Sequence, residues 1–162
     1  MMKSFEADEI LNQAYRMTAT IVFVQIFSVF LLVMLVWGIP LEEQQVTNTV
    51  LNILWVSVLM VAVAVVFLRR FFFSERRLLE KAKDGAQAVI RALKSNTILL
   101  AALAELVGIL GFLIAILSSN KMNVLRATAV SLLLFLITFP RKSRWQRIIH
   151  RVLDFQNYGK SI

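Results

Sequence analysis

The chain contains no cysteine and only one histidine, His150, among its 162 residues. The absence of cysteine excludes disulfide bonds, thiolate metal sites and thiol nucleophiles. A single histidine makes a histidine-based metal cluster within one chain implausible. The glycines show neither phosphate-binding nor dinucleotide-binding spacing. We therefore expect no metal, no cofactor and no enzymatic activity.

Charged residues are also scarce. They make up 17% of the chain, whereas 59% of the residues are hydrophobic and the mean hydropathy is +0.73. Soluble domains have about 45–50% apolar and about 25% charged residues, so this composition predicts burial in lipid. The net charge of +8 comes from basic residues that flank apolar runs. This pattern indicates anionic lipid head groups, and not nucleic acid, as the partner of the positive charge.

Four apolar runs are present, at about 18–39, 46–68, 97–118 and 123–139. Each of the first three has roughly 22 residues, enough to cross a hydrocarbon core of about 30 Å. The fourth has about 17 residues and contains Arg126 near one end, from which the side chain can reach the head groups. No cleavage pattern follows the first run, so we interpret it as a retained helix. These features predict an all-α, polytopic membrane helix bundle that forms one domain over 1–162.

The basic residues are distributed unevenly between the two sides of the predicted membrane. Sixteen of the 18 lie before the first run, in the stretch 69–96, or after Phe139, and none lies in the turn 40–45. Because short cytoplasmic loops carry an excess of lysine and arginine, both termini are predicted to be cytoplasmic. The expected location is the bacterial inner membrane.

Two segments outside the apolar runs have helical periodicity of their own. The stretch of about 74–95 repeats apolar residues at helical spacing, and it could extend the second run, lie on the membrane, or turn back toward the third run. The segment of about 142–156 places Trp145, Ile149 and Val152 on one face and basic residues on the other. This pattern is typical of an interfacial amphipathic helix, with Trp145 in the aromatic belt of the membrane surface.

The third apolar run carries small residues at steps of three and four. These residues are Ala101, Ala104, Gly108, Gly111 and Ala115. In membranes such a stripe allows another helix to approach closely, so we expect it to be a helix-packing surface.

Glu105 lies beside this stripe, roughly 12 Å into the membrane from its inner edge. A charged carboxylate there costs about 2.5–3.5 kcal/mol on insertion scales, so Glu105 needs a proton, a cation or hydrogen-bond partners. Each of the other runs offers a polar group at a similar depth, and together they predict a polar layer within the membrane. The candidates for an ion-binding site are Glu105, Gln25, Ser28, Ser57 and Ser131.

Residues 102–115, with the sequence Ala-Leu-Ala-Glu-Leu-Val-Gly-Ile-Leu-Gly-Phe-Leu-Ile-Ala, resemble the carboxylate helix of the proteolipid (c) subunits of rotary ATP synthases. The resemblance implies that Glu105 carries an ion. The sequence departs from that family because the second run has no glycine repeat and the central loop is long. The complete pattern, including Phe139, Pro140, Arg141 and Trp145 after the fourth run, resembles a group of small bacterial four-helix membrane proteins, which implies architecture without an activity.

Two functions therefore remain open. The first is a non-enzymatic structural or accessory protein that packs through its third helix, as a homo-oligomer or within a larger membrane complex. The second is a proteolipid-like carrier of protons or cations that uses Glu105.

Overall fold

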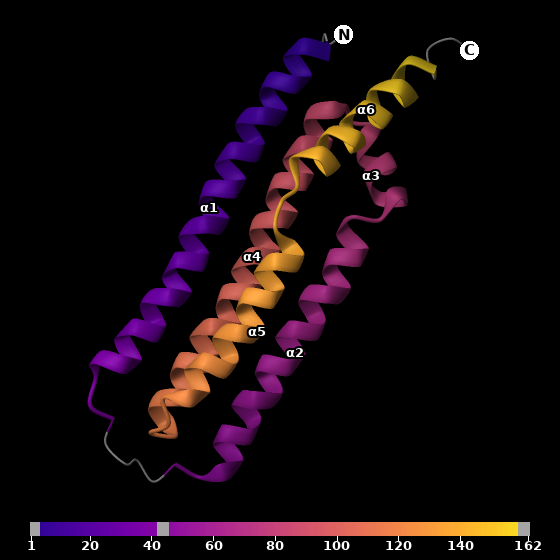
Figure 1. The fold of residues 1–162 in the computed structure, drawn as a ribbon. Helices are drawn as coiled ribbons and strands as arrows, with labels where there is room; N and C mark the ends of the chain where they lie inside the picture. Colours follow the sequence, from indigo (N-terminus) through magenta and orange to yellow (C-terminus); the bar gives the residue numbers. More distant parts are fainter. Residues whose placement is uncertain (1–3, 42–45, 159–162) are drawn as a thin grey trace.

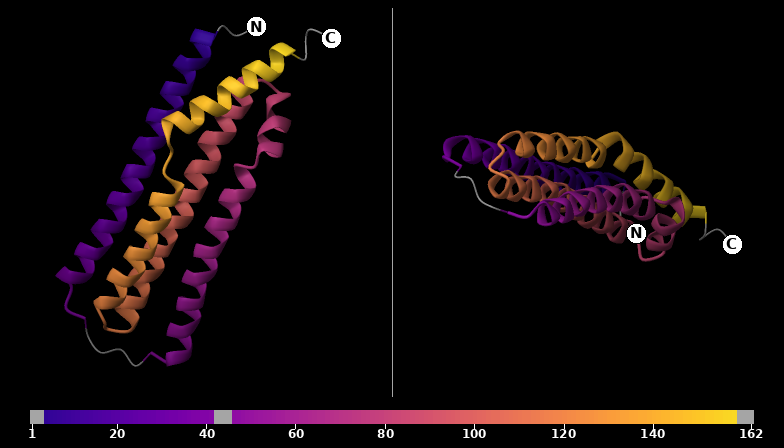
Figure 2. Two further views of the ribbon diagram at one scale, coloured as in Figure 1. Left: turned by 45° about the vertical axis from the view of Figure 1, so that its right-hand side comes forward. Right: turned by 90° about the horizontal axis from the view of Figure 1, so that it is seen from below.

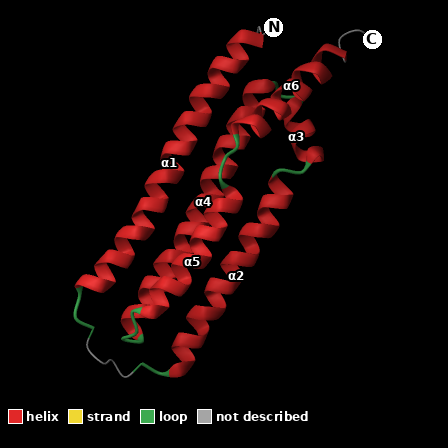
Figure 3. Ribbon diagram, viewed as in Figure 1, coloured by secondary structure: helices red, strands yellow, loops and turns green. Residues whose placement is uncertain are grey.

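The computed structural model describes residues 4–41 and 46–158. These residues form six helices and no strand, which confirms the predicted all-α fold (Figure 3). In chain order the helices are α1 (Ser4–Gly38), α2 (Asn48–Phe72), α3 (Glu75–Ala82), α4 (Ala86–Leu117), α5 (Met122–Thr138) and α6 (Lys142–Tyr158). Most of the predicted turn 40–45, with its acidic residues at 42 and 43, lies outside the described residues.

Four helical stretches in the described chain are long and apolar enough to cross a membrane. The first three lie in α1, α2 and α4, and the fourth runs from α5 into α6, as expected from the four apolar runs. α1 and α4 have 35 and 32 residues, so each is about 50 Å long and extends well beyond the hydrocarbon core. The fourth stretch, Met122–Val152, includes a break, and α5 alone has 17 residues.

The two breaks at the end that carries α3 and α6 follow from proline and glycine. Phe139 precedes Pro140 and has φ −54° and ψ 131°, the extended conformation that a following proline favours, so α5 ends at Thr138. Gly85 has φ +100°, which only glycine adopts without strain, and it separates α3 from α4. The predicted helix at 74–95 is therefore two helices, of which the second continues into the membrane. Of the three arrangements left open, the chain turns back toward the third run.

α4 is the central helix of the bundle. It packs against α1, α2 and α5, whereas α1 and α2 lie on opposite flanks of the α4–α5 pair (Figure 1 and Figure 2). α1 and α4 run parallel to each other and antiparallel to α2 and α5. α1 begins and α6 ends at the same end of the molecule, where α3 also lies (Figure 1).

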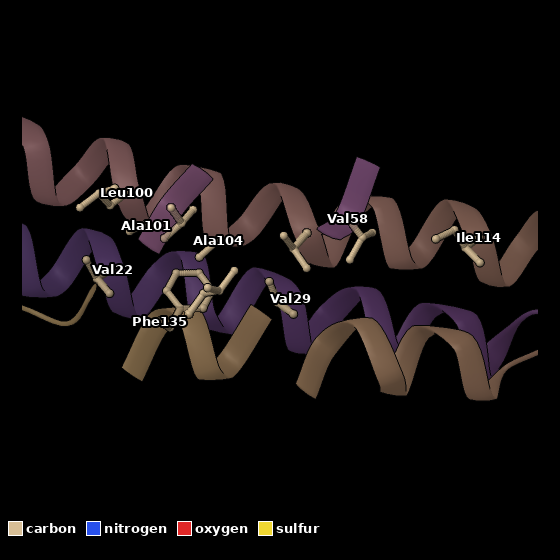
Figure 4. Packing of buried hydrophobic residues seen from close by; sticks show 11 residues of the cluster. Val22, Val29, Val58, Leu100, Ala101, Ala104, Ile114 and Phe135 are labelled. Atoms are coloured by element: carbon tan, nitrogen blue, oxygen red, sulfur yellow. The ribbon is translucent and has the colours of Figure 1, made fainter. Parts of the chain in front are cut away.

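The buried residues of α1 recur at steps of seven and four. They are Leu11, Thr18, Val22, Val29 and Val36. This spacing is that of helices that pack side by side with a left-handed twist. Figure 4 shows Val22 and Val29 of α1 in one cluster with Ala101 and Ala104 of α4 and with Phe135 of α5. The cluster also contains Val58 and Val65 of α2, so one apolar core joins the four helices.

Two glycines of α4 permit this packing. A Cβ atom placed on Gly108 would lie 2.9 Å from Cγ2 of Val29 on α1. A Cβ atom on Gly111 would overlap the Cβ atom of Ala127 on α5. The small-residue stripe is therefore a contact surface within the chain. It packs against α1 at Gly108 and against α5 at Gly111.

A second core lies at the end of the molecule that carries α3 and α6. It is formed by the start of α1, by α3, by the first turns of α4 and by α6. Trp145 is 1% exposed and its ring meets that of Tyr15 edge to face, with centroids 6.0 Å apart. The prediction that Trp145 belongs to the aromatic belt is therefore wrong, because protein covers the apolar face of α6 at Trp145, Ile149 and Val152, whereas the place of α6 at the membrane surface stays a prediction.

Candidate functional site: a carboxyl and hydroxyl pair between α1 and α4

Glu105 lies in the middle of α4 and is half-buried. The hydroxyl of Ser28 on α1 donates a hydrogen bond to Oε1 of Glu105. These residues are 77 positions apart in the sequence, so the bond joins two membrane-spanning helices. Of the four polar residues predicted at the depth of Glu105, Ser28 is the one that the structure bonds to it.

The packing of α1 on α4 explains this contact. Val29 meets Gly108, so the residue before Val29 lies level with the turn of α4 that contains Glu105. Because neighbouring residues of a helix are about 100° apart, Glu105 and Ala104 point in different directions. Gly108 faces α1 and Gly111 faces α5, and helix geometry places Ala104 on the side of Gly111 and Glu105 on the other side of Gly108. The carboxyl is thus at the edge of the α1–α4 interface, away from α5.

Gln25 lies one helical turn before Ser28, on the same face of α1. Its Oε1 atom is buried and has no hydrogen-bond partner in the described part of the chain. An amide oxygen is an acceptor only, so it needs a donor to offset the loss of water. A protonated carboxyl has one such donor, and a carboxylate has none. This part of α1 thus has one donor that bonds to Glu105, the hydroxyl of Ser28, and one buried acceptor without a partner, Oε1 of Gln25.

The other two predicted residues bond elsewhere. The hydroxyl of Ser131 on α5 donates to the carbonyl oxygen of Ala104 at 2.6 Å, and Ser131 is fully buried. The hydroxyl of Ser57 donates to the carbonyl oxygen of Ile53, one turn earlier in its own helix, at 2.9 Å. The structure therefore does not join the predicted residues into one polar layer, and its polar contacts are separate pairs.

The two basic residues nearest the far ends of α4 and α5 in sequence, Lys121 and Arg126, bond to groups other than Glu105. Arg126 is exposed, and its Nη1 donates a hydrogen bond of 3.4 Å to Oδ1 of Asn123 on the same helix. Lys121 donates to the carbonyl oxygen of Trp37 at the same end of the bundle. Within the described ranges, no group of three or more acidic, histidine or cysteine side chains is placed to hold a metal ion.

Thr128 of α5 is a polar residue that the sequence analysis did not single out. It is 6% exposed, and its hydroxyl has no hydrogen-bond partner among the described residues. A threonine in an apolar helix usually bonds to a carbonyl of its own preceding turn, so the sequence contains no signal that would identify Thr128.

Comparisons with protein-family models, with curated proteins and with solved structures found no match to this chain. The resemblance of residues 102–115 to the carboxylate helix of proteolipid subunits therefore stays a prediction.

A double-mutant cycle measures the bond between Ser28 and Glu105. We expect the changes Ser28→Ala and Glu105→Leu to be coupled by about 0.6 kcal/mol, and at most about 1.7 kcal/mol, in the free energy of unfolding in lipid. The matched control is Ser57→Ala, whose hydroxyl bonds within its own helix, and it should show no coupling to Glu105→Leu. Additive effects of Ser28→Ala and Glu105→Leu would contradict the contact.

Proposed function

We propose that this chain is a non-enzymatic integral membrane protein with a structural or accessory role. The observation that carries the proposal is the burial of the small-residue stripe of α4 between α1 and α5. Gly108 and Gly111 pack against helices of the same chain, and α4 is the centre of the bundle that they form. The polar contacts described above hold this bundle together.

Contacts with lipid or with other subunits then fall mainly on the flanking helices. α2 buries only Val58 and Val65 and directs a ridge of large apolar side chains outward. The ridge consists of Ile53, Val56, Met60, Val63 and Phe67. Its residues recur at steps of three and four, so they form one face that suits lipid chains, a second copy of the chain or a larger membrane complex.

The second candidate is a carrier of protons or cations at Glu105. It is favoured by the hydrogen bond from Ser28, by the half-burial of the carboxyl and by the unsatisfied oxygen of Gln25. A protonated Glu105 offers a donor that a deprotonated one lacks, so loss of the proton changes the hydrogen bonding of the pair. Ionisable groups within a membrane frequently serve such transfer.

Proton flux into liposomes separates the two candidates. The purified protein is reconstituted with an internal pH-sensitive dye, and a membrane potential is applied. The structural role predicts a leak equal to that of protein-free liposomes. A flux that rises with protein and is abolished by Glu105→Gln, but not by Glu80→Gln on the exposed surface of α3, would contradict it and support the carrier. Carbodiimide modification of Glu105 that sodium suppresses is the companion readout for cation binding.

We also propose that the end of the molecule that carries α3 and α6 is cytoplasmic, in a bacterial inner membrane. The support is the unequal distribution of lysine and arginine between the two ends of the spans. A reporter that is active only in the periplasm should be inactive when fused after Ile162. The same reporter inserted in the turn 40–45 should be active. The opposite pattern would reverse the orientation.

A further inference from the structure

One face of α4 is left uncovered by the other helices of the chain. α1, α2 and α5 pack on α4, and the exposed residues of its apolar run lie together on the remaining side. They are Leu99, Ala102, Leu106, Ile109 and Leu113. Helix geometry places this side opposite Gly111, which meets α5. The uncovered face therefore lies between α1 and α2, which occupy the two flanks (Figure 1).

This face is recessed relative to the outer surface of the neighbouring helix α2. Its leucine and isoleucine side chains are 38–46% exposed, whereas the residues in the ridge of α2 described above are 58–69% exposed. Protruding apolar side chains suit contact with lipid chains. A recessed apolar face between two helices has room for the side chains of a further helix.

The spacing of the face suits pairing with an identical helix. Leu99, Leu106 and Leu113 are seven residues apart, and Ala102 and Ile109 fall between them at steps of three and four. Parallel helices with this repeat interdigitate along one seam with a left-handed twist. A second copy inserts in the same orientation, so the two α4 helices run parallel, and a two-fold axis brings each seam residue to its own counterpart. The face is therefore complementary to itself.

Glu105 favours protein over lipid as the cover of this face. Ala102 and Ile109, its neighbours one turn away on the helix surface, are both exposed, and Glu105 itself is half-buried. Ser28 is its one hydrogen-bond partner in the described part of the chain. Lipid chains cannot hydrogen-bond to a carboxyl, so ionisable side chains within a membrane face protein or water. A single copy leaves Glu105 at the border with lipid, and a protein neighbour on this face covers it.

The position of Glu105 is also compatible with a second copy as that neighbour. Glu105 is about 100° around the helix from Leu106, so it lies beside the seam on the side of α1. A two-fold axis along the seam then puts the two Glu105 residues on opposite rims of the contact. The two carboxyls do not face each other, so they do not repel.

We propose that two copies of the chain pair through this face of α4. Leu106 and Ile109 lie in the seam, and Glu105 lies at its rim, where the second copy covers it from lipid. The ridge of α2 then faces lipid. The pairing requires that the helices span a bilayer, and it goes beyond the structural role by naming the partner and the contact surface. It holds for either candidate function, and its failure would leave both open.

Disulfide crosslinking of single-cysteine variants maps the contact, because the chain has no cysteine of its own. The purified protein is reconstituted in a large excess of lipid and oxidised with copper phenanthroline. We expect Leu106→Cys to give a covalent dimer on a non-reducing gel. The matched control is Met60→Cys on the ridge of α2, which should stay monomeric. Crosslinking of Met60→Cys as strong as that of Leu106→Cys would overturn the proposal. A monomeric Leu106→Cys protein would also overturn it, because lipid or another protein would then cover the face.

Fluorescence energy transfer between labelled copies in liposomes measures the strength of the pairing. Ile109→Ala removes a seam side chain from both copies, and we expect it to weaken dimerisation by about tenfold. Because Ile109 is exposed in the single chain, the variant should fold like the parent. Met60→Ala is the control and should change dimerisation by less than about twofold. Equal effects of the two changes would contradict a seam on α4.

The place of Glu105 at the rim has a separate readout. A hydrophobic carbodiimide reaches Glu105 from the lipid, so pairing should slow the reaction. The Ile109→Ala protein, diluted with lipid until it is monomeric, should therefore react faster than the paired parent chain at the same dilution. Equal rates would overturn the cover of Glu105 by the second copy.

Discussion

The close approach of α1 and α5 to α4 is the constraint on which the rest of the structure depends. Gly108 and Gly111 lack the Cβ atoms that would meet Val29 and Ala127, so both neighbouring helices can pack directly on the backbone of α4. Lipid chains are as apolar as these side chains, and helices in a membrane therefore associate through close packing and hydrogen bonds. α4 becomes the centre of the bundle because it carries small residues on two adjoining faces.

The same approach creates the polar pair. The Val29–Gly108 contact sets the register of α1 on α4, and in this register the hydroxyl of Ser28 reaches Glu105. On the other face, the short distance between α5 and α4 lets Ser131 donate to the carbonyl oxygen of Ala104. At the end of the molecule that carries α3 and α6, residues of α1, α3, α4 and α6 share a second apolar core around Trp145, which fixes α6 beside α3. That placement gathers the arginines of α2 and α6.

Some of this arrangement could be predicted from the sequence. Long apolar runs need a bilayer, and small residues at steps of three and four need a neighbouring helix, so the spans and the stripe were identifiable. Ser28 was among the four residues predicted at the depth of Glu105, but the sequence could not single it out, because depth along a helix does not tell in which direction around the helix a side chain points. Ser57 and Ser131 lie at the expected depth but face other groups. The periodicity of α6 predicts that one face is buried but does not tell whether lipid or protein covers it, and in the structure protein does.

The stability of Gly111→Ala, measured as the free energy of unfolding in lipid, tests the central claim most directly. The new methyl group overlaps that of Ala127, so the account predicts a loss of about 1–3 kcal/mol, although alanine is the better helix former. Gly38→Ala meets no neighbouring atom within 4 Å and should cause no loss. Adding Ala127→Gly to Gly111→Ala should restore most of the stability. A Gly111→Ala protein as stable as the parent chain would contradict the close packing of α5 on α4.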